Sequence, residues 1–316
     1  MPFFIRLAYF LPLILLVSGC ATESLEFTDT EKTAKNIELT ATPFYPQSRY
    51  QCGPTSLATV LNASGLNIDP DDLTDEVYLP NRKGSLQIEM IASVRRNGRI
   101  PYETGGEMQQ VINLLQDGLP VLVLLNLGLQ GLPVYHYAVV IGFSSDSDAV
   151  ILRSGTDFRL LMPRRRFLSA WHKADSWALT VLPPGKLPAS IDLQRYLKAT
   201  MEMESTGQWQ AAEVSYRAVL MRWPRNTLAR FGLANCLRLQ GKLDKAVVEY
   251  QNILAHDVNH TQARNNLADT LLRLNRCDDA VAAIEPAFDI SSTDSVVDRT
   301  IRETYLEIKS GCPHPN

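Results

Sequence analysis

A 34-residue repeat in the C-terminal part of the chain constrains the fold more than any other feature of the sequence. Three kinds of residue recur at this interval. They are a turn residue (Gly207, Gly241 and Asn275), an alanine (Ala212, Ala246 and Ala280) and a large apolar or aromatic residue (Tyr216, Tyr250 and Ile284). This period is typical of units built from two helices and a turn. Because a single helix pair cannot bury its own apolar face, neighbouring pairs must stack, and about three repeats are needed for a stable array.

The repeat resembles the tetratricopeptide repeat. The segments Gly207–Ala212 and Gly241–Ala246 are similar to the usual turn of that family. The resemblance implies an all-α solenoid over residues 190–312, with about three repeats and a capping helix from Ser295 to Lys309. Its surface would bind a protein substrate or partner.

The N-terminus has the composition of an export signal. A short basic start, Met1–Arg6, is followed by the apolar run Leu7–Val17 and then by Val-Ser-Gly-Cys, which ends at Cys20. This order defines a secretory signal peptide, and the apolar run is too short to span a bilayer comfortably. We therefore expect residues 1–19 to be a signal peptide.

The end of this signal resembles a bacterial lipobox, which implies that Cys20 carries a diacylglycerol and becomes the new N-terminus. Stable anchoring takes more than one acyl chain, and the membrane would then be a partner of the protein. Ala21 is similar to the outer-membrane sorting pattern, which implies an anchor in the outer membrane, facing the periplasm. A plain signal peptide that contains a cysteine is the alternative. Residues 20–41, rich in Thr and Glu, are expected to form a flexible tether.

Residues 42–184 mix helical and extended patterns, which predicts a separate domain. Apolar spacing and turn residues predict helices over 52–63, 86–96 and 108–116, and short apolar runs predict strands over 120–126, 137–143, 149–153 and 158–162. Because helices precede strands instead of alternating with them, the domain is expected to be of the α+β class.

Charge and cysteine usage exclude several kinds of partner. The net charge of −3 gives no basis for binding nucleic acid. The five cysteines are too scattered for a disulfide framework, and no CxxC pair or Cys/His cluster at zinc spacing occurs, so neither a metal nor another cofactor is expected. Three cysteines lie in the repeat region, Cys236, Cys277 and Cys312. Cys277 and Cys312 are the expected disulfide pair, because a terminal segment often packs on the last repeat.

Cys52 is the candidate nucleophile. It stands at the start of a predicted helix, where backbone N–H groups and the helix dipole favour negative charge and so the thiolate. Gly53 leaves room for a substrate beside the sulfur. The alternative is that Cys52 is only a small buried residue.

A thiol nucleophile needs a base, and the first domain holds two histidines. His136 begins a predicted strand, whereas His172 lies on an amphipathic helix and is expected at the surface.

Four motifs in this order resemble the papain-like peptidases that remove double-glycine leaders from bacteriocins. They are Tyr-Gln-Cys-Gly-Pro-Thr-Ser-Leu-Ala around Cys52, Gly-Ser-Leu-Gln from Gly84, Gly-Leu-Pro-Val from Gly118, and His-Tyr-Ala-Val-Val-Ile-Gly from His136. The similarity covers residues 42–183 and is greatest to a lipoprotein branch in which the peptidase domain precedes tetratricopeptide repeats. It implies a papain-like fold with Cys52 as nucleophile and His136 as general base and then acid.

The family pattern also implies an oxyanion-hole glutamine and a residue that orients the histidine. Gln47 fits the first role, although it lies five residues before the cysteine and the family residue usually lies six before. Gln51 is the fallback. For the second role the family uses Asp or Asn, whereas this chain offers Ser154 or, just beyond it, Asp157. A serine hydroxyl cannot stabilise an imidazolium as a carboxylate does.

The sequence therefore predicts an exported, lipid-anchored cysteine peptidase that cleaves a protein or peptide substrate, with repeats that recruit the substrate or a partner. Two alternatives stay open. One is a papain-like domain that has lost most of its activity and serves as a binding or assembly lipoprotein, and the other is a Cys–His pair that acts on a non-peptide amide.

Overall fold

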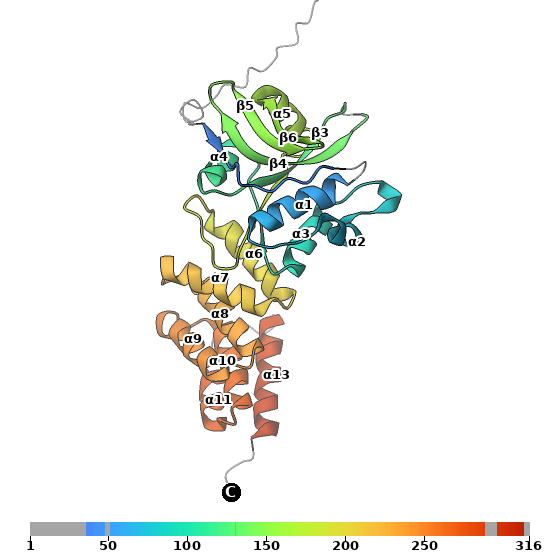
Figure 1. The fold of residues 1–316 in the computed structure, drawn as a ribbon. Coiled ribbons are helices and arrows are strands. Elements are labelled where there is room, and N and C mark those ends of the chain that lie inside the picture. Colours follow the sequence, from blue (N-terminus) through green and yellow to red (C-terminus); the bar gives the residue numbers. More distant parts are fainter. Residues whose placement is uncertain (1–35, 48–50, 130, 288–295, 313–316) are drawn as a thin grey trace, which may run out of the picture. The chain divides into compact units, whose positions relative to one another are not determined.

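The computed structural model describes residues 36–47, 51–129, 131–287 and 296–312 (Figure 1). The predicted signal peptide, Cys20 and most of the predicted tether lie outside these residues. Within the described part of the chain, no helix combines the length and the apolar composition that a membrane span requires.

An antiparallel sheet with helices on both faces forms the N-terminal domain. Its strands are β1 (Ile37–Glu38), β2 (Ile100–Glu103), β3 (Val121–Asn126), β4 (Tyr135–Ser144), β5 (Ala149–Ser154), β6 (Asp157–Pro163) and β7 (Ala178–Leu182). Its helices are α1 (Cys52–Ala63), η2 (Pro70–Leu73), α2 (Thr74–Val77), η3 (Pro80–Arg82), α3 (Gln87–Arg96), α4 (Met108–Gln116) and α5 (Arg164–His172). The strand order is β2-β7-β3-β4-β5-β6, and β1 pairs with β4. This confirms the predicted α+β class and the predicted helices.

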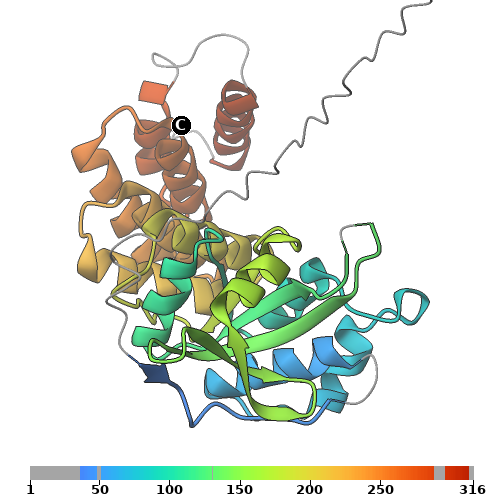
Figure 2. The ribbon, with the colours of Figure 1, turned by 90° about the horizontal axis from the view of Figure 1, so that it is seen from above.

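The alternation of side chains along β4 explains why helices cover both faces of the sheet. Tyr137, Val139 and Ile141 are buried in one cluster with Leu57 and Leu61 of α1. The intervening residues of β4 belong to a second cluster, which contains side chains of α4 and α5. Figure 2 shows α1 and α3 on one side of the sheet and α4 and α5 on the other. Because both faces are buried, β3 is a continuous apolar run and not an alternating one.

Two features of the sheet correct the sequence prediction. The tether was expected to extend to residue 41, yet Ile37 and Glu38 pair with Phe143 and Gly142 of β4, so the domain begins earlier. A pairing between residues more than 100 positions apart leaves no local signal in a two-residue strand. Strands β2 and β7 were also not predicted. Pro101 removes a backbone donor from β2, which is tolerated because β2 is an edge strand.

The C-terminal region is the predicted all-α repeat domain. Its helices form three successive pairs: α6 (Leu193–Ser205) with α7 (Trp209–Arg222), α8 (Thr227–Leu239) with α9 (Leu243–His256), and α10 (Thr261–Arg273) with α11 (Cys277–Ile284). The turn within each pair contains a residue with positive φ, namely Gly207, Gly241 or Asn275. Glycine, and more rarely asparagine, adopts this conformation without serious strain, which explains the 34-residue spacing at the turns.

A last helix, α13 (Val296–Gly311), closes the array as the predicted capping helix and contacts α10 and α11. A disulfide joins Cys277 at the start of α11 to Cys312 just after α13. This confirms the predicted pair. The free cysteines among the described residues are Cys52 and Cys236.

Removing this disulfide is expected to destabilise the repeat domain. The bond closes a segment of 35 residues, so the loop entropy of the unfolded chain predicts a loss of about 3–4 kcal/mol from the free energy of unfolding in a Cys277→Ser, Cys312→Ser double variant. Denaturant unfolding followed by circular dichroism measures this, with the reduced wild-type protein as a matched control. An unchanged midpoint in both samples would show that the bond contributes no stability.

Candidate active site

The first turn of α1 presents Cys52 at the N-terminus of a helix. The side chain of Gln51 makes no capping hydrogen bond to α1, and the first turn contains no acidic residue. Pro54 suits this turn because its missing N–H would have had no partner inside the helix. The positive end of the helix dipole and the N–H groups of Cys52 and Gly53 are therefore available to the thiol, and both N–H groups favour its ionised form.

Packing of α1 against β4 brings Cys52 to the start of the strand that carries His136. The backbone N–H of Tyr137, the residue after His136, favours the ionised form of the Cys52 thiol and so opposes the rise in its pKa. One turn along the same helix face, Ser56 Oγ donates to the Tyr137 carbonyl oxygen at 3.3 Å. The helix that begins with the predicted nucleophile thus contacts the residue that follows the predicted base, although Cys52 and His136 are 84 positions apart in the sequence.

Burial keeps both groups in their neutral forms. Burial raises the pKa of the Cys52 thiol, although the N–H groups of Tyr137, Gly53 and Cys52 itself oppose the rise. Burial also lowers the pKa of the His136 imidazole. At neutral pH burial therefore favours the thiol form of Cys52 and the neutral imidazole form of His136.

Ser154, and not Asp157, contacts the imidazole. Ser154 Oγ lies 2.9 Å from His136 Nε2 and is buried at the end of β5, the strand next to β4. Asp157 pairs with Ser154 but belongs to β6, one strand further from His136, and it is exposed. Of the two ring nitrogens of His136, Ser154 thus engages Nε2.

The side chain of Gln47 lies against the face of α1 that carries Cys52 and Ser56. Its side-chain Nε2 donates to Ser56 Oγ at 3.2 Å, four residues along the helix from the cysteine, and its backbone N–H donates to the Gly155 carbonyl oxygen at 3.1 Å. Gln51 instead lines a cavity with Thr55. Of the two glutamines, Gln47 is thus the one that shares the Cys52–Ser56 face.

Ser85 is a neighbour of the site for which the sequence predicted no role. Its Oγ is buried and has no hydrogen-bond partner among the described residues, and a Cβ on Gly53 would meet it at 2.1 Å. Its carbonyl oxygen accepts a hydrogen bond from Tyr137 Oη at 3.3 Å. In the sequence, the Gly-Ser-Leu-Gln motif that begins at Gly84 was the one feature that pointed to this residue. Glycine is therefore required at position 53, where the loop before α3 passes the helix that begins with Cys52.

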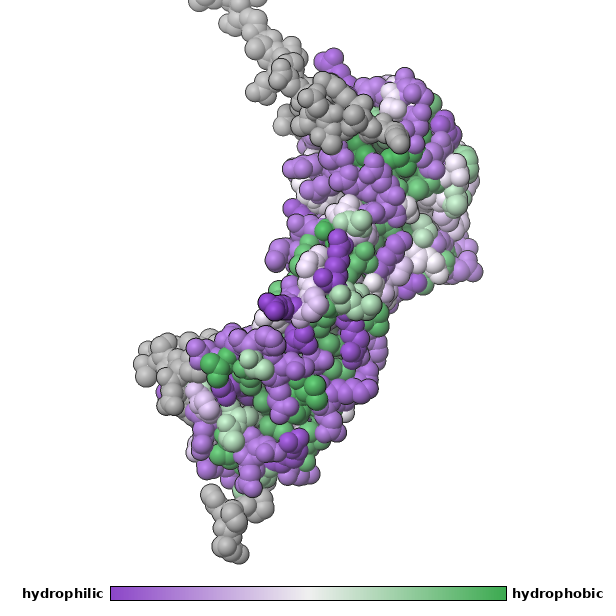
Figure 3. All heavy atoms as spheres, turned by 90° about the vertical axis from the view of Figure 1, so that its left-hand side faces the viewer, coloured by the Kyte–Doolittle hydropathy of each residue, from purple (hydrophilic) through white to green (hydrophobic). Residues whose placement is uncertain are grey.

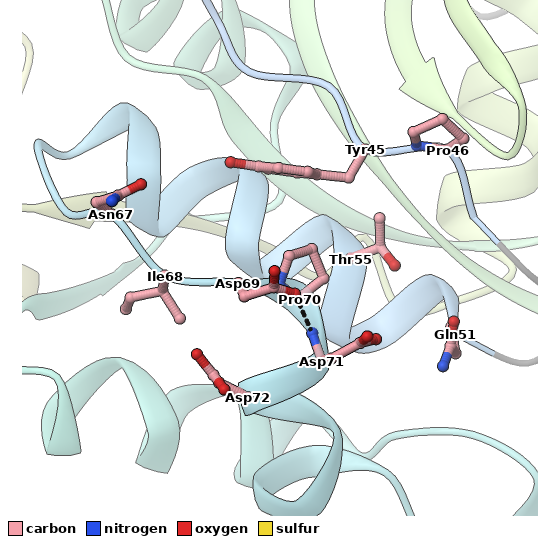
Figure 4. Close-up of a pocket in the computed structure, with 10 residues that line it drawn as sticks. All are labelled: Tyr45, Pro46, Gln51, Thr55, Asn67, Ile68, Asp69, Pro70, Asp71 and Asp72. Atoms are coloured by element: carbon pink, nitrogen blue, oxygen red, sulfur yellow. Dashed lines mark hydrogen bonds between the residues drawn. The ribbon is translucent and has the colours of Figure 1, made fainter.

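A cavity of about 520 Å³ lies beside the first turn of α1 (Figure 4). Its lining residues are Tyr45, Pro46, Gln51, Thr55, Asn67, Ile68, Asp69, Pro70, Asp71 and Asp72. Asn62 braces its wall by donating to Tyr45 Oη at 2.6 Å and to the Ile68 carbonyl oxygen at 2.8 Å. Asp69 is already occupied, because its side chain accepts from the Asp71 N–H at 2.9 Å. The cavity is polar and adjoins the residue before the nucleophile.

His172, the other histidine of the domain, lies apart from this site. His172 is exposed at the end of α5, as predicted. Among the residues that the structure describes, no group of three or more His, Cys, Asp or Glu side chains is arranged to hold a metal ion.

The sheet, the helix bearing Cys52 and the strand bearing His136 together define the fold of a cysteine peptidase. Residues 39–175, within the N-terminal domain, match the model of the Peptidase_C39-like family. Residues 205–287 match a tetratricopeptide-like family, that of anaphase-promoting complex (cyclosome) subunit 3. A peptidase domain of this family implies a peptide substrate, and repeats of this kind imply interactions with proteins.

Two solved structures are similar to the N-terminal half of the chain. A C39-like peptidase from Bacillus anthracis is 19% identical, with a TM-score of 0.40, and the match covers 47% of this chain and 98% of that one. The peptidase domain of Streptococcus ComA, a bifunctional ABC transporter of a quorum-sensing pathway, is 21% identical, with a TM-score of 0.35, and the match covers 48% of this chain and 98% of that one. The comparison with curated proteins yields no match.

Proposed function

We propose that the protein is an exported, lipid-anchored cysteine peptidase in which Cys52 is the nucleophile and His136 the general base and acid. The observation that carries this proposal is the hydrogen bond from Ser56 Oγ, one turn after Cys52, to the carbonyl oxygen of Tyr137, the residue after His136, because it places the helix that bears Cys52 against the strand that bears His136. The packing of the helix that begins with Cys52 against the strand that carries His136 supports a nucleophile and a base brought together by folding.

The reaction would proceed through an acyl-enzyme. His136 Nδ1 accepts the thiol proton while Cys52 Sγ attacks the peptide carbonyl carbon, and the carbonyl oxygen becomes an oxyanion. The Cys52 N–H and Gln47 Nε2 stabilise this oxyanion, for which Gln47 exchanges its bond to Ser56 for one to the substrate. His136 then gives the proton to the leaving amine, the C–N bond breaks, and water hydrolyses the thioester with His136 as base.

The polar surroundings of the histidine support a weaker or more conditional peptidase than one with a carboxylate behind the imidazole. Ser154 can accept the Nε2–H hydrogen bond and so fix the ring, but its neutral hydroxyl does not stabilise the imidazolium that forms during the reaction. This favours, as the second candidate, a domain of low activity that serves in binding or assembly.

The sequence signal and the disulfide both support export. Disulfides persist in oxidising compartments such as the periplasm and are rare in the cytosol, and this chain joins Cys277 to Cys312. Together with the lipobox at Cys20, this supports a protein anchored by lipid in the outer membrane and facing the periplasm. The related peptidases that cleave after a double glycine act on the cytoplasmic side of export machines. Because this chain is exported, neither that specificity nor that location is proposed for it.

The repeats would recruit a protein substrate or partner. A cavity of about 540 Å³ between α6, α7 and α8 is mostly apolar, with the polar groups of Glu204 and Asn235 among its walls. On the face drawn in Figure 3, apolar side chains are interspersed among hydrophilic ones along the repeat region. Mixed surfaces of this kind suit the recognition of an extended peptide.

Selective alkylation tests the nucleophile. Iodoacetamide near neutral pH is expected to label Cys52 in the full chain, because His136 can take up the thiol proton, and the Cys52→Ala variant is expected to remain unlabelled. Cys236 serves as the internal control, since burial raises its pKa and its side chain is fully enclosed. If iodoacetamide fails to label Cys52, every hypothesis in which Cys52 is a catalytic nucleophile is refuted. Labelling without cleavage of any member of a peptide library would favour an amidase acting on a non-peptide amide.

A further inference from the structure

The hairpin between β3 and β4 carries an exposed apolar surface that the peptidase reaction does not use. Leu129 and Leu132 at its tip are 71% and 74% exposed, and three further large apolar side chains of the hairpin are also exposed: Leu127, Val134 and Tyr135. Soluble proteins rarely gather so many exposed apolar side chains in one short segment unless the segment binds something. Figures 1 and 2 show the hairpin extending away from the sheet.

The base of the hairpin is held rigidly, so this exposure is a built feature of the fold. The buried side chain of Asn126 accepts hydrogen bonds from the N–H groups of Gly128 and Val134, each at 3.0 Å. Leu127 N–H donates to the Val134 carbonyl oxygen at 2.9 Å, which continues the pairing of the two strands. An isolated bridge between Leu129 and Leu132 closes the tip.

The composition and charge of the hairpin fit a lipid surface better than a protein. Residues 127–135 contain no charged side chain, and Gln130 is the one side chain among them with several hydrogen-bonding groups. Protein interfaces normally combine apolar contacts with about one hydrogen bond per 100–200 Å². Leucine at the tip and tyrosine at the foot are instead the residues that enter the acyl region and the headgroup level of a bilayer.

Basic side chains lie at the base of the hairpin and on the same side of the domain. Lys173 Nζ donates to the Gly128 carbonyl oxygen at 2.8 Å at the hairpin's base. The turn that carries the exposed Arg82 and Lys83 extends on the same side of the domain in both ribbon views. Basic side chains beside an apolar tip strengthen binding to anionic lipid.

We propose that the β3–β4 hairpin inserts its leucine tip into the surface of a phospholipid bilayer with anionic headgroups, which would hold the active site beside the membrane. The proposal rests on the lipid anchor proposed above. The anchor enters the domain at the far end of β4, because Ile37 pairs with Phe143. The 17 residues from Cys20 to Ile37 reach at most about 60 Å. This exceeds the length of the ten-residue β4, about 33 Å, so the anchor and the hairpin can engage one membrane.

Tryptophan quenching tests the proposal with the full lipidated protein. Leu132→Trp places a reporter at the hairpin tip, and Ser145→Trp places a matched one in the exposed, polar β4–β5 turn. The vesicles contain phosphatidylglycerol and phosphatidylcholine with brominated acyl chains. Most of the emission added by Leu132→Trp is expected to be quenched, whereas that added by Ser145→Trp is expected to persist. Adding Leu129→Asp to the Leu132→Trp variant is expected to abolish the quenching, with circular dichroism unchanged.

Unquenched Leu132→Trp emission at saturating lipid overturns the proposal. Co-flotation with the vesicles reports the lipid anchor separately, and iodoacetamide labelling of Cys52 reports the proposed nucleophile, so failure of either is distinguishable from failure of the hairpin. If Leu129→Asp slows peptide cleavage without vesicles and no quenching occurs, the hairpin binds substrate and the membrane proposal is wrong.

Discussion

Replacing His136 with alanine is expected to slow both the alkylation of Cys52 and peptide cleavage by about 10²–10⁴-fold. Burial raises the pKa of the Cys52 thiol, so without a base nearly all of the sulfur stays protonated at pH 7. Rates of iodoacetamide labelling, followed by mass spectrometry, measure the effect without knowledge of the substrate. Because burial lowers the pKa of His136, the wild-type rate is expected to fall only below the pH at which an ordinary histidine gains its proton, about 6.5.

His172→Ala is the matched control for this variant. It removes the other histidine of the same domain, which is exposed at the end of α5, where its ring stacks on Trp171. We expect its labelling rate and its pH profile to match those of the wild type. Equal rates for the two variants would show that His136 does not act on the thiol. An acid limb that survives in His136→Ala would assign the titration to another group.

Those elements of the fold that have local signals could be predicted from the sequence. Helix α1 begins at Cys52 and ends at Ala63 as predicted, because Pro54 and Gly65 mark its two ends within the chain itself. The helix pairs of the repeat domain were predicted for the same reason, since each turn needs a residue that accepts positive φ.

Elements that depend on distant pairing could not be predicted in this way. Strand β7 lies between β2 and β3, its neighbours in the sheet, although both precede it by more than 50 residues in the sequence. The start of the domain at Ile37 likewise depends on a partner in β4. In each case the stabilising contacts are tertiary, so a local pattern carries little of the information.

Of the residues of the candidate site, some likewise have a local sequence signal, whereas others depend on tertiary structure. Helix-start and strand-start positions marked Cys52 and His136 from the residues alone. The choice between Ser154 and Asp157 required the strand order, because the two residues are three positions apart but lie on different strands. The contact between Ser85 and Gly53 required the path of a loop, which no spacing in the sequence encodes.

Ser154→Asp is expected to raise the rate of Cys52 alkylation at pH 6–7 by about tenfold. A carboxylate in place of the hydroxyl, which lies 2.9 Å from His136 Nε2, would stabilise the imidazolium form and with it the thiolate–imidazolium pair. Hydrogen bonds to charged groups contribute about 1.5–3 kcal/mol, against about 1 kcal/mol for neutral ones, and a gain of about 1.4 kcal/mol corresponds to a tenfold change in the ion-pair population. The acid limb of the pH profile would fade, since protonated imidazole would then accompany the reactive thiolate.

Ser154→Asn and Ser154→Ala separate the charge of the new side chain from its shape. Asparagine has nearly the size of aspartate and accepts the same hydrogen bond without charge, so it is expected to orient His136 and to leave the rate near that of the wild type. Alanine removes the hydrogen bond and is expected to slow the reaction. If the Asp variant, with unchanged circular dichroism, reacts no faster than the Asn variant, the charge behind the histidine does not limit this site. The neutral serine would then impose no cost on catalysis, and the argument for a weakened peptidase would lose its physical basis.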